Sequence, residues 1–255
     1  MMSYIRAELY KVIHRKYTWI TLGVTLLLET LLAAGWAYTN VNGNRVDFYA
    51  GTGTLLMMLG TGFYAGVIIC DMVFASQYKH STLKNEVSFG IPRSRIYLGK
   101  LAVEWIVSML FMIVMLGYYL GLCYFALYRD PELDIVAIQM VGYCLATALP
   151  LWTGVLACTN AFYFLVKSDL GAALISLCVF EAGAVINLVA MLLSGDPLGK
   201  GLETIYNYMP GVMLGRAPEI VEDWAFCGQA WIVGAIWLVG FSALGILGFR
   251  KKEIK

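Results

Sequence analysis

The chain carries little charge. Of its 255 residues only 14% are Asp, Glu, Lys or Arg, whereas 60% are hydrophobic. A typical soluble domain has about 25% charged residues. A chain this apolar needs lipid around it, and a formal net charge of +1 gives no reason to expect a nucleic-acid partner. The composition therefore excludes an ordinary soluble domain.

Residues that bind metals or form catalytic sets are also scarce. There are two histidines, His14 and His80, and no H-E-x-x-H or G-x-S-x-G motif, so we expect neither a metal site nor catalytic residues. The glycines of residues 195–201 resemble a phosphate loop, but the run is one residue short and lacks the closing Ser or Thr. We therefore expect no cofactor in this chain and no ATP hydrolysis by it.

The six cysteines are scattered and form no C-x-x-C pair. We expect them to be small buried hydrophobic residues, and a disulfide between Cys123 and Cys144 is the alternative.

Long apolar runs dominate what is present. Six runs are each near the roughly 20 residues that a helix needs to cross the hydrocarbon core, at about residues 17–38, 53–75, 96–125, 135–166, 170–193 and 229–249. They use most of the chain, so we expect one all-α polytopic membrane domain over residues 1–255. Pro150 lies inside the fourth run and should kink or divide that helix.

Basic residues give the orientation. Most Lys and Arg fall on the side that holds both termini, while the loops on the other side are acidic. By the positive-inside rule both termini are cytoplasmic in a multi-pass protein of the cell membrane. The largest external segment, residues 194–227, contains Pro197, Pro210 and Pro218, which favours short helices that are partly re-entrant.

Two spans contain a carboxylate near their middle, Glu29 in the first and Glu181 in the fifth, where Asn187 follows. A carboxylate at this depth costs about 2.5–3.5 kcal/mol by insertion scales, so each should face protein or water. These residues either line a substrate pathway or are satisfied within the bundle. The pairs Gly62/Gly66 and Gly117/Gly121 predict close helix packing, with dimerisation as the second interpretation.

Residues 1–16 predict an amphipathic helix. Ile5, Leu9 and Val12 share one face, while the other positions include Glu8 and Lys11. This pattern is typical of a helix lying in the membrane interface. A merely basic stretch before the first span is the alternative.

Residues 74–100 form a long polar interruption between apolar runs. Tyr78, Leu83 and Val87 recur at helical spacing, with Lys84 and Asn85 on the other face, so we expect a short amphipathic helix. Gly90 and Pro92 should end it, and Ser94 should cap the next helix. In that helix Lys100 and Glu104, one turn apart, should pair.

This segment resembles the type-2 ABC transporter permeases, especially those of bacitracin and lantibiotic export. The matching residues are Asp71, Ser81, Thr82, Leu83, Lys84, Asn85, Ser88, Gly90, Ser94, Arg95 and Lys100. The resemblance implies a coupling helix within residues 76–95 that docks on a separate ABC ATPase subunit through Tyr78, Leu83, Lys84, Asn85, Val87 and Arg95.

The resemblance further implies that ATP and Mg are held by that ATPase and that the permease pairs with a second copy or a paralogue. Residues 194–227 would cap the pathway from outside. The expected function is export of an amphiphile, such as a peptide antibiotic, a lipid-like compound or a drug.

Two other functions remain open from the sequence. An intramembrane enzyme would use Glu29 or Glu181 in acid–base chemistry. A sensory or immunity scaffold would bind a peptide through residues 194–227 and transport nothing.

Overall fold

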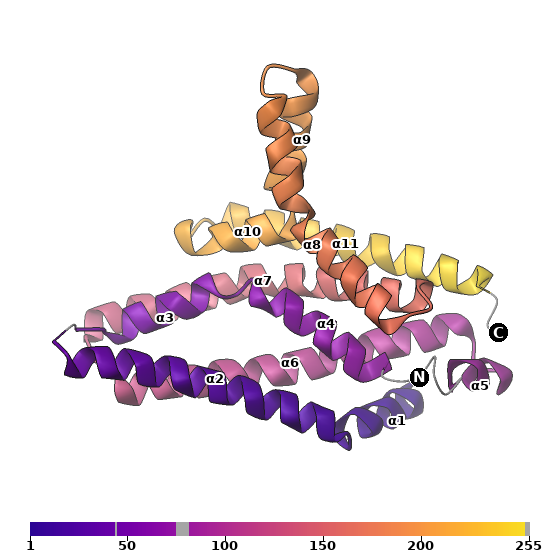
Figure 1. The fold of residues 1–255 in the computed structure, drawn as a ribbon, viewed down its shortest axis with the longest axis horizontal. Helices are drawn as coiled ribbons and strands as arrows, with labels where there is room; N and C mark the ends of the chain where they lie inside the picture. Colours follow the sequence, from indigo (N-terminus) through magenta and orange to yellow (C-terminus); the bar gives the residue numbers. More distant parts are fainter. Residues whose placement is uncertain (44, 75–81, 253–255) are drawn as a thin grey trace.

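The protein is described by a computed structural model that covers residues 1–43, 45–74 and 82–252 (Figure 1). Helices make up almost all of this described part, and an isolated bridge joins Asp47 to Tyr128. In chain order the elements are α1 (Met2–Ile13), α2 (Lys16–Val41), α3 (Phe48–Met57), α4 (Thr61–Phe74), α5 (Thr82–Ser88), α6 (Arg93–Ala126), α7 (Pro131–Leu165), α8 (Asp169–Leu192), α9 (Pro197–Asn207), α10 (Pro210–Arg216), η1 (Ala217–Glu219) and α11 (Trp224–Lys251). The predicted all-α class is confirmed.

Five of these helices, α2, α6, α7, α8 and α11, are long and apolar enough to cross a membrane. A sixth span results if α3 and α4, which meet at an angle of 59°, are taken together. The chain is thus a multi-pass membrane protein, and the six apolar runs each correspond to one helix or, in the second run, to a pair.

The second span is broken at residues 58–60, where one continuous helix was expected. Gly60 lies in the break and is a weak helix former. Trp152 of α7 fills the bend: its indole Nε1 donates to the Leu59 carbonyl at 3.2 Å. A Cβ added at Gly62 would lie 2.5 Å from the same ring nitrogen. The indole thus provides a partner for a backbone group at the break, as a break at membrane depth requires.

Pro150 does not divide α7, which is one helix of 35 residues. At this point α11 packs directly on it: a Cβ at Gly234 would lie 2.3 Å from the Pro150 carbonyl oxygen, and one at Gly154 would lie 2.8 Å from the Gly234 carbonyl oxygen. Of the two expected outcomes, a kink or a division, the division does not occur, because a proline removes a single ladder hydrogen bond and the α11 backbone packs against the helix at this point.

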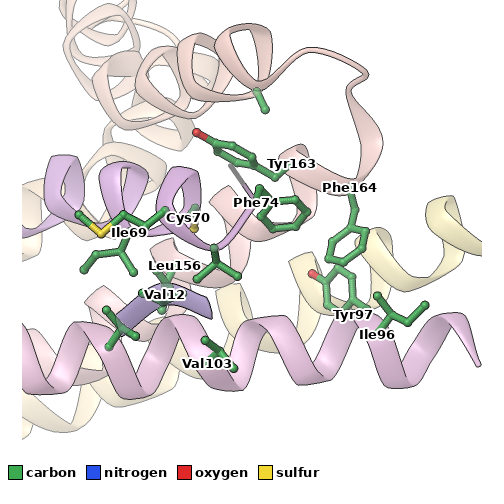
Figure 2. Packing of buried hydrophobic residues seen from close by; sticks show 14 of the residues in the cluster. Val12, Ile69, Cys70, Phe74, Ile96, Tyr97, Val103, Leu156, Tyr163 and Phe164 are labelled. Carbon is green, nitrogen blue, oxygen red and sulfur yellow. The ribbon is translucent and has the colours of Figure 1, made fainter. Parts of the chain in front are cut away.

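The two ends of the described chain lie at one end of the bundle, with α1, α5, the first turns of α6 and the last turns of α11 (Figure 1). We call this the terminal end and the opposite one the distal end. A buried cluster fills the bundle near the terminal end (Figure 2). Aromatic rings contact one another within this cluster. The centroid of the Phe164 ring lies 4.9 Å from that of Phe74, 4.9 Å from that of Tyr97 and 4.7 Å from that of Phe249. Aromatic contacts therefore join α4, α6, α7 and α11.

The α8 helix runs out of the bundle, and α9 returns beside it, so the two form a projecting hairpin (Figure 1). The residues between α8 and α11 fold as the short elements α9, α10 and η1, as the prolines predicted. All six cysteines are free, and five of them are buried as expected. Cys178 is exposed, so the prediction is wrong for that residue.

Candidate functional site

The short helix α5 lies at the terminal end with its apolar face turned into the bundle. Leu83 is 2% exposed, and Val87, one turn on, packs against the same buried cluster. Lys84 and Asn85 are exposed on the other face, as predicted from the sequence. Leu83 and Val87 thus anchor α5, and Lys84 and Asn85 are open to a partner. Tyr78 lies outside the described residues.

Gly90 ends α5 through a left-handed turn, with φ of +81°. The Gly90 amide donates to Val87 at 3.0 Å and the Ile91 amide donates to Glu86 at 3.3 Å. This pair of bonds is the Schellman arrangement, in which glycine takes the left-handed position without a Cβ penalty. The turn leaves the Phe89 side chain 86% exposed beside Lys84 and Asn85. The predicted helix stop is confirmed, and Phe89 is a surface residue that the sequence reasoning missed.

The next helix begins at Arg93, with Pro92 as its N-cap and no side-chain cap bond, so the predicted Ser94 cap is wrong. The proline already has a φ of −58°, and its carbonyl accepts from the Arg95 amide at 2.9 Å. Arg95, in the first turn of α6, is exposed. The Arg93 Nη1, by contrast, lies 2.7–2.8 Å from three carbonyls at the C-terminal end of α11, where a cation is favoured.

The N-terminal helix α1 is tied to both α5 and α6. The Tyr4 hydroxyl donates to Glu86 of α5 at 2.9 Å, and the Lys11 ammonium lies 3.9 Å from the same carboxylate. Tyr4 also sits against Gly99 of α6, where an added Cβ would lie 2.5 Å from its ring. Burial and two nearby carboxylates raise the pKa of Tyr4, so its hydroxyl keeps the proton that it donates.

A buried ion pair joins α1 to α6. The Lys100 ammonium lies 2.9 Å from the Glu8 carboxylate, with side chains 0% and 2% exposed, and Lys11 also contacts Glu8. Burial alone would raise the pKa of Glu8, but Lys100 and Lys11 outweigh it and hold that pKa below its usual range.

Two predictions about these residues are therefore wrong. Glu8 does not lie on the solvated face of α1, and Lys100 pairs with Glu8 instead of with Glu104. The spacing of Glu8, three residues after Ile5 and four before Val12, places it on the apolar face. That spacing is the signal that could have identified its buried position.

The two mid-span carboxylates belong to different parts of the bundle. Glu29 is half-buried in α2, and its Oε2 has no hydrogen-bond partner among the described residues. Glu181 is exposed in α8 and accepts a hydrogen bond from the Tyr64 hydroxyl of α4. Asn187 is half-buried further along α8. No described hydrogen bond links Glu29 to Glu181, and α4 lies between their helices in Figure 1.

An apolar cleft of about 610 Å³ lies near the distal end, between the α8–α9 hairpin and α11. Its lining residues are Ile186, Thr204, Ile205, Tyr208, Met209, Gln229, Ile232, Val233, Ile236 and Trp237. Neither mid-span carboxylate is among them. The cleft suits a hydrocarbon group, and it contains no charged side chain that would bind an ionic one.

The two predicted glycine pairs differ in their surroundings. Gly62 faces Trp152, and a Cβ at Gly66 would lie 3.7 Å from Leu156, so this pair packs against α7 as predicted. Cβ atoms at Gly117 and Gly121 would meet nothing within 4 Å.

Comparison with known families gives a match over most of the chain. The model of the ABC-2 family transporter protein matches residues 4–187. The chain belongs to the ABC-2 transporter family. It is therefore a permease component of an ABC transporter, and permeases of this family are generally non-catalytic membrane components. The family match extends from α1 into α8 and includes α5, and a search of curated proteins gave no match.

Proposed function

We propose that this ABC-2 permease is the membrane subunit of an ATP-driven exporter for an amphiphilic substrate, in which α5 docks on a separate ATPase subunit. The substrate classes that we propose are a peptide antibiotic, a lipid-like compound or a drug. ATP and Mg are held by the ATPase, and the permease works with a second copy or a paralogue. The terminal end faces the cytoplasm of a cell whose plasma membrane holds the protein.

One observation carries the docking proposal: α5 is fastened to the bundle by Leu83 and Val87 and presents Lys84, Asn85 and Phe89 outward. An exposed ring next to polar side chains is typical of a residue that anchors a protein interface. Arg95 extends this surface across the chain reversal. The basic residues near both termini support the cytoplasmic orientation by the positive-inside rule.

For the substrate pathway we propose the polar side chains Glu29, Glu181 and Asn187. Charged or polar groups at membrane depth are expensive and mark pathways in many transporters. Glu181 supports this role because its carboxylate is exposed in α8 and is held by a residue of a different helix, Tyr64. The apolar cleft beside α9 gives an amphiphile a second, hydrocarbon-like contact.

The docking proposal is tested by photo-crosslinking in native membranes. A benzophenone amino acid replaces Lys84, and a control variant carries it at Lys200, in α9. We expect a crosslinked partner that binds an azido-ATP analogue at position 84 and none at position 200. Equal crosslinking at both positions, or no nucleotide-binding partner at position 84, would contradict the docking surface.

Transport itself is tested with the permease and its ATPase reconstituted in lipid vesicles. We expect an amphiphilic peptide to stimulate ATP hydrolysis and to accumulate on the side opposite the ATPase. A complex that binds the peptide with no change in ATP hydrolysis would instead favour the sensory scaffold.

A further inference from the structure

Three fully buried ionisable residues lie where α1 crosses α6. Lys100 pairs with Glu8 at 2.9 Å, and its ammonium also lies 5.3 Å from the centre of the Phe74 ring. Glu104, one turn further along α6, is 0% exposed. Neither of its carboxylate oxygens has a hydrogen-bond partner among the described residues. The site thus holds one ammonium group and two carboxyl groups, of which only one is paired.

Glu104 is within reach of the same ammonium. Residues four apart on a helix are neighbours, with about 5–6 Å between their Cβ atoms, so Glu104 lies beside Lys100 on α6. A lysine has a flexible four-carbon stem that turns without a backbone change. Lys100 can therefore reach Glu104 by rotating its own side chain.

The energetic cost favours an exchange of partners over a simple break. Removing one partner of a buried ion pair is strongly destabilising because the other charge stays buried and unpaired. If Glu104 takes over as Glu8 leaves, Lys100 keeps a carboxylate throughout. Glu8 leaves together with Lys11, its neighbour on α1, and enters water.

We propose that Lys100 exchanges Glu8 for Glu104 when α1 moves away from α6, so that Glu104 serves as the second docking partner of this lysine. The exchange lets α1 detach and reattach without leaving the Lys100 ammonium unpaired. Glu104, which is neutral while it is buried without a partner, releases its proton to water as it takes Lys100 and regains a proton when Glu8 returns. In this state Glu104 is a positioning residue, since it acts on α1 through Lys100.

The contacts of α1 indicate that α5 is the element that would move it. The Tyr4 hydroxyl is bonded to Glu86 of α5, so displacement of α5 is transmitted to α1 at this point. This last step, in which the ATPase drives the exchange, rests on the proposed function. The exchange itself depends only on the permease.

The experiment measures the distance between α1 and α6 by pulsed electron paramagnetic resonance on the full permease in lipid nanodiscs. Spin labels are attached at Tyr10→Cys and Leu98→Cys, both exposed positions. The background variant is Cys178→Ala, since the other native cysteines are buried. We expect Glu8→Gln to shift the population towards longer distances, because only Glu104 is then left to pair with Lys100.

Adding Glu104→Gln to Glu8→Gln should reverse this shift, since Lys100 then has no carboxylate in the detached state either. Glu104→Gln alone should fold normally, because the pair with Glu8 stays intact, and Glu104→Asp should keep the response. If Glu104→Gln leaves the distances unchanged in the Glu8→Gln background, the exchange is refuted.

With the ATPase bound, we expect ATP to raise the longer-distance population in the parent protein and Glu104→Gln to abolish that rise. If ATP has no effect on the parent while the permease-alone variants behave as expected, the ATP-driven step fails and the exchange stands.

Discussion

The close approach of α7 and α11 gives a quantitative test of the packing. An added methyl group at Gly234 would lie 2.3 Å from the Pro150 carbonyl oxygen and 2.5 Å from its carbon, whereas carbon contacts are optimal at about 3.5–4.0 Å. The obstacle is backbone and cannot rotate away, so Gly234→Ala must push the two helices apart. Overpacking of this kind costs about 1–3 kcal/mol.

A second term opposes this loss, because alanine is a better helix former than glycine by about 0.8–1.0 kcal/mol. Taking the upper part of the overpacking range, we expect Gly234→Ala to lower the free energy of unfolding by about 2 kcal/mol. Gly240→Ala is the matched control: it lies on the same helix, and its Cβ meets nothing within 4 Å. Gly240→Ala therefore gains only the stability that comes from the higher helix propensity of alanine.

The assay is reversible unfolding in mixed micelles, titrated with a denaturing detergent. The difference between the two variants cancels helix propensity and isolates the contact, and we expect it to be about 3 kcal/mol, the top of the overpacking range. Equal stability of the two variants would refute the backbone-to-backbone packing of α7 and α11.

Three further predictions follow from other contacts. Arg93→Ala should lower the free energy of unfolding by about 1.5–3 kcal/mol through loss of charged hydrogen bonds to α11. Replacement of the exposed Arg95 by Ala should change the free energy of unfolding by no more than about 0.5 kcal/mol. Unfolding of both variants by titration with a denaturing detergent measures the two values. Tyr64→Phe should cost about 0.6 kcal/mol, the average for hydrogen bonds in membranes, and the loss should vanish in a Glu181→Gln background. The pKa of Glu8 is lowered in the folded protein from its ordinary value of 4.5. The stability that its pair with lysine contributes is therefore fully present above that pH and is lost as the pH falls from there through the lower pKa of the folded protein; an acid titration of stability should lose this dependence in Glu8→Gln.

Much of the fold could be read from the sequence, because a bilayer imposes strong rules. Every spanning segment must be a long apolar helix, so hydropathy located the spans. The stop at Gly90 was also predictable, since a left-handed residue after a helix favours glycine. Local patterns of this kind are set within a few residues of chain.

The parts that could not be predicted depend on distant partners. The break before α4 depends on Trp152, which lies some ninety residues further along the chain. The pairing of Lys100 with Glu8 instead of with its neighbour Glu104 depends on where α1 crosses α6, which periodicity does not give. For the candidate site, the face of α5 was predictable from its spacing, while the exposure of Phe89 follows from the turn geometry.

The C-terminal residues of α11, together with Lys252, contact the ends of two other helices. Arg93 reaches the carbonyls of this end from α6, and the Lys252 ammonium donates to Phe164 and Val166 at the end of α7. A truncation before residue 249 would remove all of these contacts and release the ends of α6, α7 and α11 at once.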